Sequence, residues 1–486
     1  MRLSELTEGR IAGPAGDIEI AGLTADSRLV EAGFLFAAMP GTRLDGAAFA
    51  AEAVARGAVA VLARPDAGLQ AIDVPVIEDA DPRRRFALFA ARFFGAQPAV
   101  VAAITGTNGK TSVADFTRQI WARLGCRAAS LGTLGVIGPD GKQPLAHTSP
   151  EPALLHRLLK GLADDGVDHL AIEASSHGLD QSRLDGLRVT AGAFTSFSRD
   201  HLDYHATAED YLAAKLRLFG VVMDTGGKAV LNVDIAEHDE IVSLCARRKH
   251  EVITYGASDS DLRLHSRVSL AGGQRLELEV FGIRSDIELP LVGDFQAMNA
   301  LCALGLTIAC GADRDRALAV LPELKGVAGR LQHVANHPSG AAAYVDYAHT
   351  PDALERALRA LRPHTDGRLI VVFGCGGDRD RGKRPQMGAI AARFADVPIV
   401  TDDNPRGEAP AAIRAEVMPA CPGGVEIGDR GEAIRAGVGR LGPGDVLLVA
   451  GKGHEQGQIV GDEVRPFDDA TEVRRAVAEL AGGAGR

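Results

Sequence analysis

The sequence is poor in cysteine, in positive charge and in long apolar runs. Its six cysteines are scattered over 486 residues with no C-x-x-C pair, so neither a zinc site nor a disulfide framework is indicated. No apolar run reaches the ~20 residues that a membrane-spanning helix needs, and the first residues lack the hydrophobic region of a signal peptide. We therefore expect a cytoplasmic protein without a membrane span, with reduced and mostly buried thiols.

The charge balance limits the class of partner. Lysine and arginine number 53 against 64 aspartate and glutamate residues, which gives a net charge of −11. Because a nucleic-acid groove requires clustered basic residues, nucleic acid is not expected as a partner, and anionic substrates must meet local basic clusters. A chain of 486 residues that is 46% hydrophobic is too long for one core and predicts about three domains. Nothing in the sequence suggests more than a monomer.

A glycine-rich loop lies between a predicted apolar strand at 100–104 and a predicted helix with apolar residues at helical spacing. Backbone N–H groups at the start of such a helix point at phosphates, Lys110 can reach the terminal phosphates, and the Thr111 hydroxyl can join a Mg²⁺ shell. The longer form of this loop has glycine where Ile104 stands, so only the shorter G-x-x-G-K-T part of the motif is matched. An ordinary helix cap is the alternative. We predict an ATP-binding loop made of Gly106, Thr107, Asn108, Gly109, Lys110, Thr111 and Ser112.

Strand-like apolar runs alternate with alanine-rich helical stretches, which predicts α/β layers with mostly parallel sheets. Breaks near 94–98 and 324–329 divide the chain into units 1–96, 97–326 and 327–486. Within the middle unit, alternating polar and apolar residues at 250–290 predict an antiparallel excursion.

Polar residues follow two predicted strands of the middle unit. The strand 169–172 delivers Glu173 to its carboxyl end, where doubly wound sheets bind ligands, so Glu173 is a candidate Mg²⁺ ligand. The strand 191–197 leads to His201 and His205, which lack the glutamate of a zinc-protease signature; a polar loop with hydrogen-bonded histidines is the alternative. Lys215 lies beside an apolar helical stripe, and spacing alone indicates a solvated cation.

Three predicted strands of the last unit end in polar loops: 369–373, 397–401 and 446–450. The first loop has glycines like those of a dinucleotide fingerprint, but Arg379 stands where the third glycine belongs, so a nicotinamide site is not favoured. Arg406 in the second loop can form two hydrogen bonds to a carboxylate, while Asp403 and Glu455 can attract an ammonium. The pattern indicates a crevice of mixed charge.

Five motifs follow one another along most of the chain: 106–111, 173–179, 198–205, 346–352 and 402–406. They resemble the motifs of the Mur ligases of peptidoglycan synthesis, most closely those that add meso-diaminopimelate. The resemblance implies three domains: an N-terminal UDP-binding α/β domain, a central P-loop ATPase-like domain with a mostly parallel sheet, and a C-terminal Rossmann-like domain. It also implies an ATP-dependent amide ligase that adds meso-diaminopimelate to the D-glutamate of UDP-MurNAc-L-Ala-D-Glu through an acyl phosphate.

The same resemblance implies roles for single residues. Lys110, Glu173, His201 and Lys215 would be catalytic, with Lys110 stabilising the transferred phosphoryl group. Mg²⁺ would be held by Thr111, Glu173, His201 and Lys215. Lys215 would act as a carbamate formed with CO₂, which turns a cation into an anionic oxygen ligand.

Substrate contacts are also implied by the resemblance. ATP would meet Asn299, Arg330 and Asp346. Diaminopimelate would meet Arg379, Asp403, Asn404, Pro405, Arg406, Gly451 and Glu455. The UDP-MurNAc-dipeptide would meet Ser27, Thr42, Arg43, Leu44, Thr148, Ser149, Ser175, Gln181 and Arg183. From the residues alone, the segments at 26–28 and 41–46 are equally an N-cap and a tight turn, and Thr148-Ser149 stands where the family carries a threonine doublet.

Three alternatives remain open. An L-lysine-adding Mur ligase would share most of these motifs and differ at 403–406. A folylpolyglutamate synthetase-like ligase would share the ATP half, but it has no need of the turns that would hold UDP. A nucleotide-dependent switch would need only the phosphate loop and a mobile partner-binding surface. It leaves Glu173, His201, Lys215 and the C-terminal crevice without a role.

Overall fold

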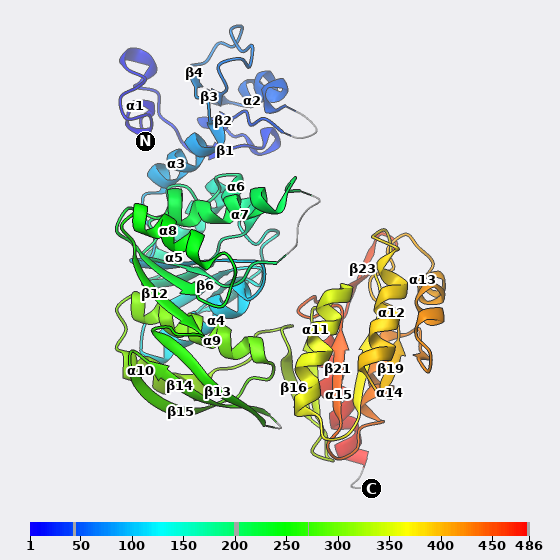
Figure 1. Ribbon diagram of the computed structural model, residues 1–486. Coiled ribbons are helices and arrows are strands. Elements are labelled where there is room, and N and C mark those ends of the chain that lie inside the picture. The colour runs from blue at the N-terminus through cyan, green and yellow to red at the C-terminus, as the bar shows by residue number, and fades with distance from the viewer. Residues whose placement is uncertain (42–44, 199–203, 271, 484–486) are drawn as a thin grey trace. The chain divides into compact units, whose positions relative to one another are not determined.

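The computed structural model describes residues 1–41, 45–198, 204–270 and 272–483 (Figure 1). The chain forms two compact units, residues 1–255 with 302–317 and residues 256–301 with 318–486. Both units contain a mostly parallel sheet with helices, so the predicted α/β class is confirmed. In the described ranges no helix is long and apolar enough to cross a membrane.

The first unit opens with a four-stranded parallel sheet in the order β1-β2-β3-β4. Its elements are β1 (Gly22–Thr24), β2 (Phe34–Ala37), α2 (Ala50–Ala55), β3 (Ala58–Ala63), β4 (Val76–Glu78) and α3 (Pro82–Phe94). Helix α3 begins where the Asp81 carboxylate caps it and Pro82 fills its first position, and it ends at Gly95. Phe86 and Phe89 of α3 are buried in the core of this sheet.

A buried carboxylate ties α3 to the remainder of the first unit. The Asp185 side chain is 3% exposed and accepts a hydrogen bond from Arg84 of α3 (3.1 Å) and another from Arg217 (3.2 Å). Arg217 is the last residue of α7 (Ala208–Arg217), and its Nε donates to the Leu179 carbonyl oxygen at 2.7 Å. One side chain therefore links the N-terminal helix α3 to α7.

The central sheet of the first unit has the order β12-β11-β10-β5-β9-β6-β7-β8 and is parallel from β12 to β6. Its strands are β5 (Val100–Thr105), β6 (Ala128–Gly132), β7 (Gly135–Gly138), β8 (Gly141–Gln143), β9 (His169–Glu173), β10 (Ala191–Phe194), β11 (Lys228–Asn232) and β12 (Glu251–Gly256). The helices among them are α4 (Lys110–Arg123), α5 (Pro152–Asp164), α6 (Ser176–Asp180), α7 and α8 (His238–Arg247). Strand β5, which carries the phosphate loop, thus lies between β10 and β9.

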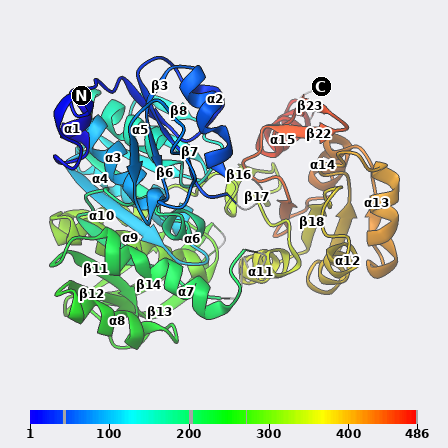
Figure 2. The ribbon, with the colours of Figure 1, turned by 90° about the horizontal axis from the view of Figure 1, so that it is seen from above.

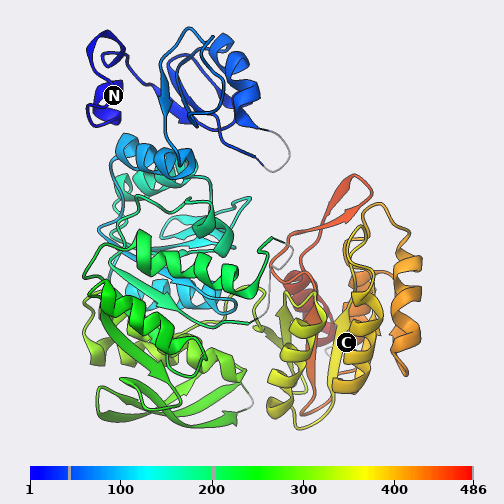
Figure 3. The same cartoon turned by 45° about the horizontal axis from the view of Figure 1, so that its top comes forward.

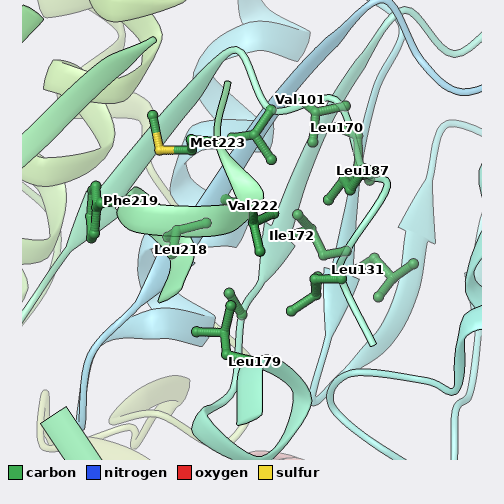
Figure 4. Close-up of a cluster of buried hydrophobic side chains, with 14 of the residues drawn as sticks. Val101, Leu131, Leu170, Ile172, Leu179, Leu187, Leu218, Phe219, Val222 and Met223 are labelled. Carbon is green, nitrogen blue, oxygen red and sulfur yellow. The ribbon is translucent and has the colours of Figure 1, made fainter. Parts of the chain in front are cut away.

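Apolar side chains from both the strands and the segment after α7 fill one core (Figure 4). Strands β5 and β9 are buried almost throughout, as expected for central parallel strands. Helix α7 runs into a π-helical turn, η4 (Leu218–Val222), whose Leu218, Phe219 and Val222 pack in this core. The segment after α7 is therefore packed in the core of the central sheet.

The second unit contains an antiparallel meander of β13 (Leu262–Leu270), β14 (Gly273–Val280) and β15 (Ile283–Leu289), which confirms the predicted excursion. Helices α9 (Asp294–Ala309) and α10 (Arg314–Val320) follow. A six-stranded sheet then has the order β16-β17-β21-β18-β19-β20, with β16 antiparallel to the rest. Its strands are β16 (Gln332–Asn336), β17 (Ala342–Asp346), β18 (Leu369–Phe373), β19 (Val397–Val400), β20 (Val425–Glu426) and β21 (Val446–Ala450).

Helices cover both faces of this six-stranded sheet. They are α11 (Pro351–Leu361), α12 (Lys383–Phe394), α13 (Pro410–Val417), α14 (Arg430–Val438) and α15 (Asp469–Gly483). Figure 2 shows α11 and α12 on one side of β18, and α14 and α15 on the other. A hairpin of β22 (Gly457–Val460) and β23 (Glu463–Pro466), red in Figure 3, projects from the body of the sheet.

Two predicted strands are shorter than the apolar pattern indicates. Strand β10 ends at Phe194 rather than at 197, and β19 ends at Val400 rather than at 401. After Phe194, the Thr195 hydroxyl donates to the carbonyl oxygens of Thr105 (3.2 Å) and Asn108 (2.5 Å). The residues just after β10 therefore support the phosphate loop.

Candidate functional site

The phosphate loop is a tight connection between β5 and α4. Gly106 and Gly109 have φ angles of +138° and +88°, which favour glycine, and α4 begins at Lys110. A Cβ added at Gly106 would lie 2.0 Å from the Thr195 hydroxyl. The Ser196 carbonyl accepts from Thr107 N at 2.7 Å, so the loop is held from outside at the N-terminus of a helix, where backbone N–H groups favour an anion.

Two lysines meet at this loop. Lys110 Nζ donates to the carbonyl oxygens of Gly106 and Thr107, both at 2.8 Å. Lys215 Nζ, from α7, donates to the same Gly106 oxygen at 2.7 Å, and its side chain lies over the Tyr211 ring with the nitrogen 4.2 Å from the ring centroid. Lys215 is 1% exposed, so the indication of a solvated cation is wrong. Its long side chain leaves the α7 stripe and reaches back to the loop.

Glu173 stands at the end of β9, beside the loop. Its carboxylate accepts from the Thr111 hydroxyl (3.1 Å), from Thr133 N (2.8 Å) and from the Thr133 hydroxyl (3.2 Å), and it is 2% exposed. A Cβ on Gly132 would lie 2.1 Å from its Oε1 atom, so glycine is needed there. A buried carboxylate beside a threonine hydroxyl at a phosphate loop is the oxygen donor set that Mg²⁺ prefers. His201, the other expected ligand, lies outside the described residues.

Hydroxyl groups continue from Glu173 into a polar cluster. The Ser149 hydroxyl donates to the Glu173 carbonyl oxygen (3.1 Å) and lies 2.9 Å from the Ser175 hydroxyl. The hydroxyls of Thr148 and Thr133 lie 3.0 Å apart. Ser175 caps α6 by accepting from Gly178 N at 3.1 Å. The structure therefore brings the predicted Thr148, Ser149 and Ser175 next to Glu173.

Arg183 and Gln181 complete this cluster. Arg183 donates to the Ser149 carbonyl oxygen (2.8 Å) and to the Gln181 side-chain oxygen (2.7 Å). Gln181 in turn donates to the Tyr204 hydroxyl at 3.0 Å. Burial lowers the pKa of Arg183 and raises the pKa of Glu151, although each opposes the shift of the other. The result is a partly buried guanidinium suited to a carboxylate or phosphate group.

Ser27, an N-terminal candidate within the described residues, follows the end of β1. Ser27 opens a short 3-10 helix, η2 (Ser27–Leu29), which Asp26 caps by accepting from Arg28 N at 3.0 Å. The hydrogen bond from the Arg28 side chain lowers the pKa of Asp26. Thr42, Arg43 and Leu44 lie outside the described residues. In the structure the N-cap is Asp26, and Ser27 follows it, half-buried.

Within the second unit, the three expected ATP contacts lie on one short network. Asn299 Nδ2 donates to the Gln296 side-chain oxygen (3.0 Å), and Gln296 Nε2 donates to the Arg330 carbonyl oxygen (3.4 Å). Asp346 accepts from Leu331 N at 2.6 Å, and burial raises its pKa, opposed first by the Arg330 charge. Asn299, Arg330 and Asp346 are thus brought together through the 330–331 backbone.

Polar groups at the ends of β19 and β21 are hydrogen-bonded to one another where the sequence predicts a crevice. Asn404 Nδ2 donates to Glu455 at 2.9 Å, and the completely buried Lys452 donates to Asn404 Oδ1 (2.8 Å) and to Glu455 (3.1 Å). Gly451 has a φ angle of +118°, and a Cβ there would lie 2.6 Å from Asp403 Oδ2. That oxygen is buried and accepts no hydrogen bond from the described residues. It is an acceptor suited to an ammonium group.

The loop after β18 is hydrogen-bonded to the loop after β19. Arg406 Nη1 donates to the Gly377 carbonyl oxygen at 2.9 Å, and a Cβ on Gly377 would lie 1.9 Å from the Pro405 carbonyl oxygen. Arg379, in the same loop, is exposed and donates to the Asp378 carbonyl oxygen at 3.0 Å. Hydrogen bonds therefore connect the three predicted strand ends, with Arg406 between the loops after β18 and β19.

Several site residues were missed from the sequence. They are Thr133, Tyr204, Gln296, Arg430 and Lys452. Thr133 could have been found, because it follows β6, which is parallel to β9 and must end at the same edge. Arg430 forms a completely buried ion pair with Asp469 (2.7 Å) and donates to the Ala450 carbonyl oxygen (2.9 Å), contacts that no spacing predicts.

Known proteins match the chain along most of its length. Family models match at 19–94 (Mur ligase family, catalytic domain), 104–307 (Mur ligase middle domain) and 329–453 (Mur ligase, glutamate ligase domain). A UDP-N-acetylmuramoyl-L-alanyl-D-glutamate--2,6-diaminopimelate ligase of Caulobacter vibrioides is 54% identical over 469 residues, which cover 95% of this chain and 96% of that protein.

Solved structures agree with these matches. A ligase of the same name is 32% identical, covers 99% of both chains and has a TM-score of 0.77. A folylpolyglutamate synthase of Mycobacterium tuberculosis, solved with ADP and AMPPCP, covers 82% of this chain and 95% of its own at 20% identity and a TM-score of 0.60, which shows a shared fold alone. Identity of 54% along nearly the whole chain goes far beyond a shared fold, and we conclude that this protein belongs to the Mur ligase family.

Proposed function

We propose that the protein is a Mur ligase of the MurE type, which joins meso-2,6-diaminopimelate to the D-glutamate of UDP-MurNAc-L-Ala-D-Glu with ATP as the energy source. The observation that carries the proposal is the continuity from the phosphate loop, through Thr111 and Glu173, into the hydroxyl and guanidinium cluster of Ser149, Ser175 and Arg183. A phosphoryl donor and a carboxylate acceptor bound there would be neighbours.

The chemistry asks for two steps. A carboxylate oxygen of D-glutamate attacks the γ-phosphorus of ATP, and ADP leaves. The amine of diaminopimelate then attacks the carbonyl carbon of the acyl phosphate, phosphate leaves, and the nitrogen loses a proton. Phosphoryl transfer needs positioning and charge neutralisation above all. Lys110 supplies a cation at the loop, and Arg183 with Ser149 would hold the acceptor peptide.

Mg²⁺ fits the donor set around Glu173. Thr111, Glu173, His201 and a carboxylated Lys215 would hold it, and bound Mg²⁺ would neutralise phosphate charge. Lys110 and Lys215 meet at one carbonyl oxygen, Gly106 O, which places two cations close together. Addition of CO₂ to the neutral Lys215 amine, with loss of a proton, would replace one cation by an anionic oxygen ligand and relieve that repulsion.

The predicted C-terminal crevice suits an amino acid that carries carboxylate and ammonium groups at both ends. Asp403 Oδ2 is a buried acceptor for an ammonium, and Arg406 and Arg379 are donors for carboxylates. Lys452 already neutralises part of the Glu455 charge, so Asp403 is the stronger ammonium partner. L-Lysine lacks the second carboxylate and would leave an arginine without a substrate partner.

The units proposed for these tasks are 1–96 for the UDP-sugar, 97–326 for ATP and 327–486 for the amino acid. Cytoplasmic location, where these soluble precursors are made, and a monomeric state belong to the same proposal.

Phosphate release with ATP, Mg²⁺ and UDP-MurNAc-L-Ala-D-Glu tests the proposal, with diaminopimelate, L-lysine or no amino acid added. Release stimulated by diaminopimelate alone is expected. Preference for L-lysine would refute the assignment of the crevice. Phosphate release that does not depend on an amino acid would indicate a nucleotide-dependent switch. Activity with a folate and glutamate instead would favour a folylpolyglutamate synthetase-like ligase.

A further inference from the structure

A cavity lies in the first unit, at the end of the central sheet away from the phosphate loop. It measures about 200 Å³, and its walls include Trp121, Cys126, His169, Cys310 and Arg316. His169 begins β9 and pairs with the first residue of β5, whereas Glu173 ends β9 beside Ile104, just before the loop. The cavity is therefore separated from the Glu173 cluster by the length of β9.

Two side chains of metal-ligating type, Cys126 and His169, line this cavity, and a third, Asp168, lies next to them. The Cys126 sulfur, one carboxylate oxygen of Asp168 and one ring nitrogen of His169 all lie within 4.8 Å of one another. Thiolate, carboxylate and imidazole are the ligands that Zn²⁺ takes, at roughly 2.0–2.3 Å in a tetrahedron, which puts neighbouring ligand atoms roughly 3.5 Å apart. Small changes of the side-chain rotamers, which move these atoms by about 1 Å, would bring them from their present separation to the separation that the metal needs.

The backbone beneath these side chains is fixed. Gly125, with a φ angle of +92°, ends the turn after α4, and Cys126 N donates to the Trp121 carbonyl oxygen at 3.0 Å. Asp168 N donates to the Arg127 carbonyl oxygen at 3.0 Å, and β6 and β9 are paired from His169 onward. The ligand positions are therefore set by secondary structure.

The His169 ring is also oriented before any metal binds. Its Nδ1 lies 2.7 Å from Asp168 Oδ1, and its ring centroid lies 4.9 Å from that of the buried Trp121. The imidazole is 19% exposed, which leaves it accessible from the cavity. The imidazole is therefore held against the Trp121 ring and beside the Asp168 carboxylate, and these two contacts fix its position.

We propose that Cys126, Asp168 and His169 bind one divalent cation of the Zn²⁺ type, with a water or small anion from the cavity as the fourth ligand. A thiolate and a carboxylate together carry two negative charges, which balance the cation. Arg316 at the cavity wall then favours an anionic fourth ligand. This site differs from the Glu173 cluster, whose hard oxygen ligands suit Mg²⁺.

The site would act on folding and not on the ligase chemistry. Cys126 follows the last turn of α4, whose first residue is Lys110, and His169 begins the strand that delivers Glu173. A metal there would fasten the far ends of the two elements that carry the phosphate loop and Glu173. Because it binds the folded chain, it would raise the unfolding midpoint as its concentration rises above the dissociation constant.

Cobalt(II) provides the test, because a cysteine thiolate bound to Co²⁺ gives an intense charge-transfer absorption in the near ultraviolet. The full-length protein is freed of metal with a chelator and titrated with Co²⁺ in excess Mg²⁺, which occupies hard oxygen sites. One equivalent of Co²⁺ is expected to give the absorption, and Zn²⁺ is expected to remove it. In Cys126→Ser the absorption should be absent. In His169→Gln the affinity should fall by more than the roughly 10–100-fold that loss of an outer-shell partner costs.

Two matched cysteine variants act as controls. Cys310→Ser changes a thiol on the same cavity, and Cys421→Ser changes a buried thiol of the second unit; both should keep the absorption. If Cys126→Ser does not fold, protection of Cys126 from alkylation by Zn²⁺ in the unchanged protein decides the question. No absorption in the unchanged protein, absorption that survives Cys126→Ser, loss in Cys310→Ser, or unprotected Cys126 would each overturn the proposal.

Discussion

The sharpest test of the Glu173 cluster is the addition of one methyl group at Gly132. In Gly132→Ala the new Cβ would lie 2.1 Å from Glu173 Oε1 and 2.5 Å from both Cγ and Cδ, whereas ordinary contacts begin at 3.4 Å. Because three atoms of the side chain are too close, the whole carboxylate must move by roughly 1 Å, and rotation of its tip cannot relieve the contact. The hydrogen bonds from Thr111 and Thr133 would be lost or lengthened.

A displacement of roughly 1 Å at a phosphoryl-transfer site costs about 100-fold in rate, or about 2.7 kcal/mol of transition-state stabilisation. We expect kcat for ATP-dependent ligation to fall by this factor, with a smaller change in the KM for diaminopimelate, because its proposed site is elsewhere. Steady-state phosphate release across ATP and amino-acid concentrations measures both constants.

Gly161→Ala is the matched control for this substitution. Gly161 lies in α5, is exposed and has no atom within 4 Å of an added Cβ. Alanine should stabilise this helix by roughly 0.5–1 kcal/mol and leave kcat unchanged. Parent activity in a folded Gly132→Ala protein would refute the role given to the position of Glu173.

Three further predictions concern single side chains. Lys215→Ala should lose most ligase activity and regain part of it with a small added carboxylic acid; phosphate release measures this, and full activity without the acid would contradict the carbamate. Asp469→Asn should lower the free energy of unfolding by about 3–5 kcal/mol in urea melts, because Arg430 would keep a completely buried charge without its anion, and an unshifted midpoint would contradict that. Burial lowers the pKa of His156 to about 4 from its ordinary 6.5. Between these two pH values the unfolded chain therefore binds more protons than the folded protein, and the free energy of unfolding should fall by up to about 3 kcal/mol from pH 6.5 to pH 4. Thermal melts measure this, and the fall should be smaller in His156→Leu.

The strands that carry the site were predictable because each is a short, nearly continuous apolar run. The starts of β5, β9, β18 and β21 agree with the predicted ones, and Glu173 stands where its strand end placed it. Strand β10 was predicted too long because apolar Phe197 extends the pattern, whereas the segment after Phe194 is hydrogen-bonded to the phosphate loop. The spacing of apolar residues along the sequence carries no information about contacts with distant backbone.

Burial of charged side chains was the least predictable feature. The neighbours of Lys215 in the sequence are those of an ordinary surface helix. The side chain is nevertheless buried, because it reaches the carbonyl oxygen of Gly106, over 100 positions earlier. Lys452 and Arg430 are buried for the same kind of reason, through partners at Asn404 and Asp469. The proposed Cys126 and His169 site escaped spacing rules as well, because parallel pairing of β6 with β9 brings its ligands together.

The contact of Asp185 with both Arg84 and Arg217 bears on how freely parts of this family can be exchanged. Separate family models for the N-terminal and middle segments invite chimeras in which residues before 97 come from another ligase. Such a graft would break a shared carboxylate bridge unless the donor supplies an arginine at the position of Arg84. A working hybrid must therefore keep all three of these side chains compatible. Choosing the junction only by the position of the linker does not ensure that.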